Sequence, residues 1–373
     1  MKNLFRICLL LLLVNVTYAQ KKVLDHSDKG IWNTIENRTI SNNGDFVLYS
    51  LKKGDRDQHL KIKDGKANLL FEYERSERGQ FSYDSKFAFF NIKAWKDSVA
   101  EMKRKNKKIK KDKLPKDTLG IYNIESGAFD KIANVKSYKV PEKWSGYVAY
   151  MLEDIKEKKT AKKEEVKDST VKEEKKKKKK VKKVGKDNGY HLVVRNLATK
   201  QQDTFKYVTD YAFAKEGKRL AFTSTGNDSL FDAGVYALNL KNNKLTNVYK
   251  AEKAKYYQLS LSDSGEHLGF VVDTDTTKVQ IRPNELYTWK SGDAAAQKLV
   301  DAASAPNGYL VSSDGAISFS KDESKLFFGL RKPPIVKDTT LIDEEIVNVE
   351  VWTYDEPRLY TCLLYTSPSP RDS

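Results

Sequence analysis

The chain has 373 residues, which is room for one large domain or two to three ordinary ones. Charged residues make up 32% of it and the net charge is +17, a value that invites comparison with nucleic-acid-binding proteins. Two segments, residues 96–117 and 153–187, hold surpluses of six and seven positive charges, and the first nineteen residues add two. The rest of the chain therefore carries only +2. A basic groove built into the folded part is excluded as the main source of charge, and we expect no nucleic-acid partner.

Residues 1–19 are typical of a secretory signal peptide: two basic residues precede the apolar run Ile7–Val14, and small residues end at Ala19. The apolar run is far shorter than the ~20 residues that span a bilayer. A lipoprotein is disfavoured because Cys8 precedes the apolar core instead of following it. We predict cleavage near Ala19, export to the periplasm or the medium, and no membrane span.

The other end of the chain, residues 362–373, resembles a translated sequencing adapter. The DNA of a transposase adapter encodes Cys362–Asp372 in order. We therefore expect the natural sequence to stop near Thr361 in a truncated fragment, and we exclude the tail from the fold. Since Cys8 belongs to the signal and Cys362 to the tail, the mature chain is expected to contain no disulfide and no thiolate zinc site.

A ten-residue pattern recurs along the body of the chain. Each copy is a short apolar step, a turn rich in Asp, Asn, Ser and Gly, and a run of strand-forming residues. The copies are Ile40–Tyr49, Phe81–Phe90, Phe213–Phe222, Leu261–Phe270 and Phe319–Phe328, with a weaker copy at Lys143–Tyr150.

Most copies precede an alternating strand with its own polar turn and then a short strand. The alternating segments are Gly120–Gly127, Tyr190–Thr199, Gly234–Asn243 and Glu285–Gly292. Repeats of about 40–50 residues with four strands each are the sequence signature of a β-propeller. We predict an all-β fold over residues 20–361, a propeller of WD40-like or TolB-like repeats with five or more four-stranded blades, in preference to a β-sandwich.

The charge lies in two insertions, at about residues 100–116 and 153–186. Both contain almost no core-forming residues, and the second includes six consecutive lysines, Lys175–Lys180. Such runs repel themselves and bury too little apolar surface to fold, so we predict disordered, solvated loops. Weak contact with anionic surfaces is the alternative. Stacking on nucleic-acid bases is disfavoured, because aromatic residues are missing from both runs.

The sequence contains no Gly-x-Ser-x-Gly nucleophile elbow, no His-Glu-x-x-His motif, no phosphate-binding glycine loop and no dinucleotide fingerprint. The four histidines, His26, His59, His191 and His267, are expected to be structural. We accordingly predict no catalytic, cofactor-binding or metal-binding residue, and no cofactor.

Two weaker patterns remain. Asp273 and Asp275, near Thr277, suggest an acidic metal loop, but the glycine and closing glutamate of a calcium-binding loop are missing. A solvated turn is the preferred interpretation. Asn37 and Asn227 begin glycosylation triplets, which arise often by chance.

Three stretches carry a family resemblance: Trp32–Asp45 opening the first blade, Asp117–Tyr122 after the first insertion, and Val349–Asp355. With them the chain resembles, over about residues 23–361, the amino-terminal half of exported serine peptidases of the prolyl-oligopeptidase (S9) family, notably the long Bacteroidetes versions. The resemblance implies a propeller followed by an α/β-hydrolase domain that holds the catalytic Ser, Asp and His. That domain is not in this sequence, so no catalytic residue is carried over.

Two functions remain open. In the first, the chain is the gating propeller of such a peptidase, which restricts access to short peptides and has its own hydrolase domain and peptide substrates as partners. In the second, it is a stand-alone TolB-like propeller that binds a protein partner. We also expect an incomplete ring, in which Val349–Tyr354 is one strand of an unfinished blade.

Overall fold

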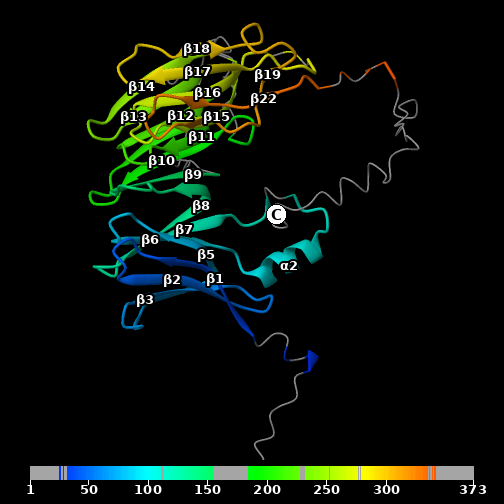
Figure 1. Ribbon diagram of the computed structural model, residues 1–373. Coiled ribbons are helices and arrows are strands. Elements are labelled where there is room, and N and C mark those ends of the chain that lie inside the picture. The colour runs from blue at the N-terminus through cyan, green and yellow to red at the C-terminus, as the bar shows by residue number, and fades with distance from the viewer. Residues whose placement is uncertain are drawn as a thin grey trace, which may run out of the picture.

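A computed structural model describes residues 32–110, 113–153, 184–226, 232–251, 253–275 and 279–334, and single residues beside these ranges (25, 26, 28, 277, 336, 338, 340 and 341). Within these ranges, up to residue 300, strands that follow one another along the chain pair antiparallel in groups of four. We call each group a blade. Figure 1 shows the blades following one another from the first to the last in chain order.

The blades have the following strands. Blade 1 contains β1 (Asn33–Ile40), β2 (Phe46–Lys53), β3 (His59–Asp64) and β4 (Leu69–Glu74). Blade 2 contains β5 (Ser76–Phe81), β6 (Phe87–Ile92), β7 (Asp117–Asn123) and the first part of β8 (Phe129–Lys139). Blade 3 contains the rest of β8, β9 (Tyr147–Leu152), β10 (Tyr190–Asn196) and the first part of β11 (Gln202–Phe213).

Blade 4 contains the rest of β11, β12 (Arg219–Ser224), β13 (Gly234–Asn239) and β14 (Lys244–Lys250). Blade 5 contains β15 (Lys255–Leu261), β16 (His267–Asp273), β17 (Glu285–Lys290) and β18 (Gln297–Val300). The last four strands, which we call blade 6, are short and form two nested pairs: β19 (Leu310–Val311) with β22 (Leu330–Arg331), and β20 (Ser318–Phe319) with β21 (Leu326–Phe327).

The long strands β8 and β11 each serve two blades. β8 pairs with β7 in its first part and with β9 in its second, and β11 does the same with β10 and β12. At each changeover the pairing register shifts, next to a residue with a left-handed backbone, Asn134 (φ 61) or Tyr207 (φ 57). Blades 2, 3 and 4 thus form one continuous ten-stranded sheet.

The recurring turn has a recurring hydrogen-bond pattern. A serine hydroxyl at the end of the first strand accepts the backbone N–H of the residue five positions later, at 2.9–3.0 Å. The donor and acceptor pairs are Phe46 with Ser41, Phe87 with Ser82, His267 with Ser262 and Lys325 with Ser320. The left-handed position between them suits glycine, as in Gly44 (φ 81) and Gly265 (φ 77). This chemistry explains why Ser, Asp and Gly recur in the sequence.

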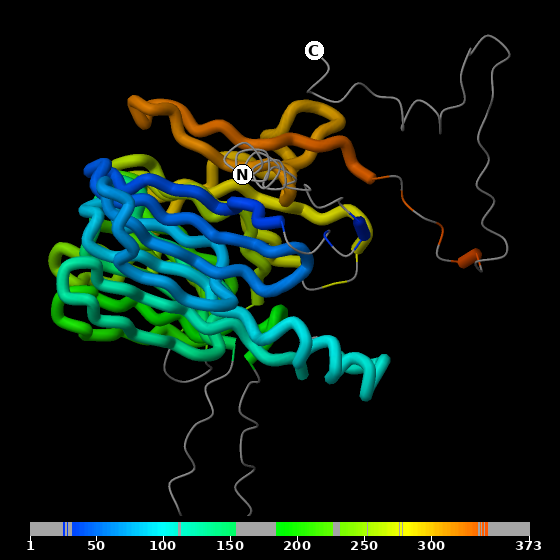
Figure 2. The backbone as a smooth tube through the Cα atoms, turned by 90° about the horizontal axis from the view of Figure 1, so that it is seen from below, coloured from blue at the N-terminus to red at the C-terminus, as the bar shows by residue number. Residues whose placement is uncertain are grey.

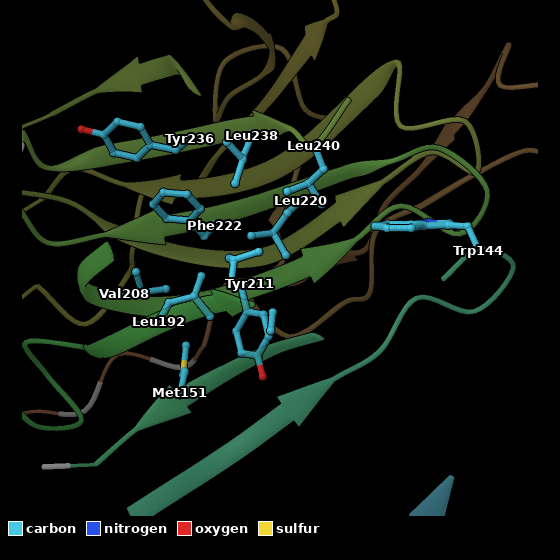
Figure 3. Packing of buried hydrophobic residues seen from close by; sticks show 12 residues of the cluster. Trp144, Met151, Leu192, Val208, Tyr211, Leu220, Phe222, Tyr236, Leu238 and Leu240 are labelled. Carbon is cyan, nitrogen blue, oxygen red and sulfur yellow. The ribbon is translucent and has the colours of Figure 1, made fainter. Parts of the chain in front are cut away.

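The apolar core lies between the blades, because the second strand of an inner blade buries both its faces. In β6, Phe90 packs toward blade 1 against Leu48, while Phe89 packs toward blade 3 against Val148. Figure 3 shows the cluster between blades 3 and 4, where Leu192 lies near Phe222. Equivalent clusters join blades 4 and 5, and blades 5 and 6. Stacked four-stranded meanders with face-to-face cores form a β-propeller, which confirms the predicted fold class.

The described part of the propeller is an open arc. Blade 1 and blade 6 lie at opposite ends of the molecule in Figure 1, and no pair of their strands is in extensive contact within the described residues. Ile35 and Ile40 on β1 are 56% and 67% exposed. The predicted strand at Val349–Tyr354 lies outside the described residues, so the unfinished blade stays a prediction.

The first insertion is partly helical, which corrects the expectation of a disordered loop at Ala100–Lys105. Residues Lys96–Lys105 form α2, between β6 and β7. Low apolar content was the wrong criterion, because Ala, Met, Glu, Lys and Arg all favour helix, and the Glu101–Lys105 pair (2.6 Å) adds i,i+4 support. Within the described residues, no helix has the length and apolarity needed to span a membrane.

Several predicted segments cannot be compared with the structure. The signal peptide (1–19), most of the second insertion (154–183) and the tail (362–373) lie outside the described residues.

Candidate functional site: the inner strands

The first strands of the blades form the inner wall of the arc. β1 contacts β5, β11 contacts β15, and β15 contacts β20, so these strands converge from neighbouring blades. The fourth strands β4, β14 and β18 are the far edges of their sheets. A surface shared by several blades is the usual binding region of a propeller, which makes the side chains of the inner strands the candidate site.

Three inner strands carry a bulge at the same place, four residues before the turn serine. The bulged residues are Asn37, Arg78 and Gln258, with φ values of 51, 55 and 54. Left-handed backbone is uncommon for residues other than glycine, and bulges re-aim side chains at functional surfaces. Asn37 and Arg78 are exposed. Sequence analysis missed these positions as a set, although their fixed offset from the serine was a usable signal.

Polar bonds connect the inner strands of neighbouring blades. The Tyr138 hydroxyl of β8 donates to the Arg78 carbonyl of β5 at 2.8 Å. The Lys139 ammonium donates to the Tyr211 carbonyl of β11 at 2.5 Å. The Gln258 amide of β15 donates to the carbonyl of Ser313 at 3.0 Å. The wall is therefore polar and is bonded across at least three blade junctions.

Two tyrosine hydroxyls in this wall stay neutral. Burial raises the pKa of Tyr138 and that of Tyr211 well above the ordinary value of 10. The Tyr211 hydroxyl lies 3.2 Å from the Ser137 hydroxyl. Since both phenols keep their proton at neutral pH, they act as hydrogen-bonding groups and not as bases.

The charges of the wall are mixed. Lys139 Nζ lies 3.9 Å from an Asp210 carboxylate oxygen, and Lys52 Nζ lies 3.6 Å from one of Glu36. Arg78, on β5, is exposed. The inner wall therefore presents hydrogen-bond donors, acceptors and charges of both signs.

The structure does not bring the four histidines together. His59 lies at the outer part of blade 1, where its Nδ1 is 3.8 Å from a Glu72 oxygen, beside a recess of about 400 Å³ lined by His59 and Glu72–Arg75. His191 is buried in β10 with its ring 5.8 Å from that of Tyr207.

The other two histidines are equally separate. His267 opens β16 with its ring 6.0 Å from that of Phe319, and His26 is an exposed residue before blade 1. Among the described residues there is no group of three or more His, Cys, Asp and Glu side chains suited to a metal ion.

The acidic motif at Asp273 differs from the expected solvated turn. Asp273 is only 2% exposed, and its carboxylate lies 3.5 Å from the Arg282 guanidinium. Asp275 turns away and accepts bonds from the N–H and hydroxyl of Thr277, both at 2.6 Å. The expectation was wrong for Asp273, because it is the last residue of β16 and pairs with Lys255 of β15 instead of lying in the turn.

Of the two glycosylation triplets, Asn37 is the exposed bulge residue of β1, and Asn227 lies outside the described residues.

Comparison with known proteins gives similarity of fold only. No family model matches the chain, and no curated protein does. Among solved structures, the β-propeller domain of the Trilobed protease from Pyrococcus furiosus is 13% identical, with a TM-score of 0.38, over 81% of this chain and 80% of that one. Pyrococcus horikoshii acylaminoacyl peptidase is 11% identical, with a TM-score of 0.37, over 83% of this chain and 44% of its own length.

A putative TolB from Agrobacterium tumefaciens is 9% identical, with a TM-score of 0.31, over 72% of this chain and 81% of that one. This chain therefore spans less than half of the acylaminoacyl peptidase and most of the Trilobed protease propeller domain and of the putative TolB. Because these identities and TM-scores are low, the fold is established by the strand pairing and not by these similarities.

Proposed function

We propose that this chain is the substrate-gating, non-catalytic propeller of an exported serine peptidase of the prolyl-oligopeptidase family that cleaves short peptides. The sequence resemblance supports this reading, and two of its three stretches lie at defined places in the fold. Trp32–Asp45 forms β1 and the first turn, and Asp117–Tyr122 forms most of β7. The nucleophile, base and orienting acid then belong to a hydrolase domain beyond the propeller.

The observation that carries the proposal is the polar, cross-bonded inner wall. A gate must keep its blades together while it admits an extended peptide and holds back a folded protein. The bonds from Tyr138 to Arg78 and from Lys139 to Tyr211 join neighbouring inner strands, and the exposed Arg78 remains available to a passing peptide.

The first test is to read the coding sequence beyond the Thr361 codon. The proposal requires a continuing frame with a Gly-x-Ser-x-Gly motif several hundred residues on. A stop codon soon after the last blade contradicts it and favours the TolB-like binding module, whose partner would then be sought by affinity capture.

The second test uses that longer protein. It should cleave short peptides and spare folded proteins, while this chain alone should cleave neither. Tyr138→Phe together with Lys139→Ala removes the side-chain donors of both bonds, and should raise cleavage of longer peptides relative to short ones. Unchanged length selectivity contradicts gating by the inner wall, and turnover by this chain that a substitution within residues 20–361 abolishes contradicts the non-catalytic assignment.

A further inference from the structure

Helix α2 leaves the propeller on the face opposite the recurring turns. It follows β6, which begins at a turn and ends at the other face, and Figure 2 shows the helix projecting beyond the blades. None of its residues is buried. Its first residue is held by blade 1, because Lys96 Nζ donates to the carbonyls of Asp55 (3.1 Å) and Arg56 (2.9 Å).

The helix has one apolar stripe. Trp95, Val99 and Met102 follow the spacing i, i+4, i+7 and therefore share a face. Trp95, just before the helix, is 47% exposed, although the Arg75 guanidinium lies 4.7 Å from its ring centre. Val99 and Met102 are half-buried.

The charges are arranged around this stripe. On a helical projection Lys96 and Lys103 border it, while Asp97 and Glu101 lie on the opposite side. Residues 96–110 hold seven basic and two acidic side chains, and all seven basic side chains are exposed. Lysines beside a narrow apolar stripe, with the acids turned away, suit a helix that lies on an anionic surface.

Contact with such a surface would also stabilise the helix. Ten residues without a fully buried side chain are marginally stable as a helix in water. The residues that join the insertion to the propeller are nevertheless held by ion pairs. Lys116 pairs with Glu153, next to the end of β9, and Lys93 pairs with Asp117 at 2.6 Å. An insertion that is anchored at its base and carries a helix with no buried residue is suited to docking on another surface.

We propose that α2, with Trp95, docks this protein on a membrane surface that bears anionic headgroups. Lipid is favoured over nucleic acid because a bilayer takes up both parts of the helix, the apolar stripe in the interface and the lysines at the headgroups. A duplex would engage the cations alone and leave Trp95 in water.

The test is sedimentation of the full chain with vesicles of phosphatidylcholine, with and without phosphatidylglycerol. Binding should require phosphatidylglycerol and weaken with salt. A variant carrying Lys103→Glu, Arg104→Glu, Lys107→Glu and Lys108→Glu should lose affinity by on the order of 100-fold. Unchanged binding by this variant assigns the attraction to other lysines and overturns the proposal.

The matched control reverses the same amount of charge on the turn face, through Lys86→Glu, Lys218→Glu, Lys241→Glu and Lys244→Glu, four exposed lysines. It should keep near-parental affinity. An equal loss in both variants shows a response to net charge only and contradicts the proposal. Both variants should melt like the parent, since neither touches a buried residue.

Insertion of Trp95 gives the second readout. Anionic vesicles should shift tryptophan emission to the blue in the parent, and Trp95→Phe should remove most of this shift. A short DNA duplex should give no such shift and should bind more weakly than the vesicles. Tighter binding to the duplex, or a blue shift that Trp95→Phe leaves intact, overturns the lipid assignment.

Discussion

The two faces of the propeller are built differently. On the turn face, neighbouring blades bond to each other through their turns. The Glu323 carboxylate accepts the N–H and the hydroxyl of Ser264, both at 2.7 Å, and joins blades 5 and 6. The N–H of Glu216 donates to the Asp263 carbonyl at 2.8 Å and joins blades 4 and 5. Asn43 and Ser85 link blades 1 and 2 in the same way, at 3.2 Å.

On the opposite face the connections β6–β7 and β9–β10 carry the two insertions. The Lys116–Glu153 ion pair joins the end of the first insertion to the start of the second. None of the residues of α2 is buried. The difference shows how one fold accepts long charged segments. The turn face fixes the order of the blades by repeated local chemistry, while the other face adds length and charge without disturbing the cores.

The largest effect is expected where two turns touch most closely. A Cβ on Gly217 would lie 1.7 Å from the Ser264 carbonyl oxygen. Gly217→Ala should therefore lower the free energy of unfolding by about 1–3 kcal/mol, measured by denaturant unfolding. The control is Gly65→Ala, where the nearest atom is 3.8 Å away and a change within about 0.5 kcal/mol is expected. Equal effects would show that the turns do not constrain the blades.

A smaller loss is expected for the turn serine. The Ser82 hydroxyl accepts the Phe87 N–H at 2.9 Å and donates to Asp84 at 2.6 Å, in a residue that is 1% exposed. Ser82→Ala should cost about 1 kcal/mol, because the Phe87 N–H loses this acceptor. Ser98→Ala on α2 should cost nothing measurable. A neutral Ser82→Ala would contradict the role given to the recurring serine.

Acid should weaken the junction of blades 5 and 6. Burial raises the pKa of Glu323, but the hydrogen bonds from Ser264 outweigh it and hold the pKa below the ordinary 4.5. The carboxylate therefore contributes stability above about pH 4.5 and loses it as the pH falls through the lower folded value. Glu323→Gln should remove this part of the pH dependence, measured as the difference in Tm between the two proteins. Parallel curves would show that Glu323 does not contribute.

The smallest effect is expected on the insertion face. Ala100→Gly disfavours α2 by about 1 kcal/mol. The global Tm should nevertheless stay unchanged, because none of the residues of α2 is buried. Trypsin should cut within residues 103–113 before it cuts the blades, and faster in the variant. A lower Tm would show that α2 is part of the cooperative fold.

The sequence predicted those parts of the fold that depend on residues close together along the chain. The serine and the glycine of the turns at Ser41 and Ser262 act within one hairpin, so their spacing reveals the repeat. Contacts that depend on which blades become neighbours could not be read in this way. The ring contact of Trp144 with Phe213 and the bond from the Asn284 amide to the Val311 carbonyl of blade 6 are of this kind.

The candidate site was harder to predict from the sequence than the fold. The inner wall has no catalytic motif, and its members Arg78, Tyr138 and Lys139 matter through the strands that they join. Helix α2 was missed for another reason. The count of apolar residues in the insertion outweighed its helix signals, Asp97 in the first turn and the Glu101–Lys105 pair.

Hydrogen exchange compares the two faces most directly. The amides of Phe87 and His267, which donate to turn serines, should exchange only through global unfolding. The amides of Val99 and Asn106, bonded only within α2, should exchange orders of magnitude faster. Protection of Val99 equal to that of Phe87, or turn amides that exchange as fast as those of α2, would contradict a propeller held at its turn face and open to insertions at the other.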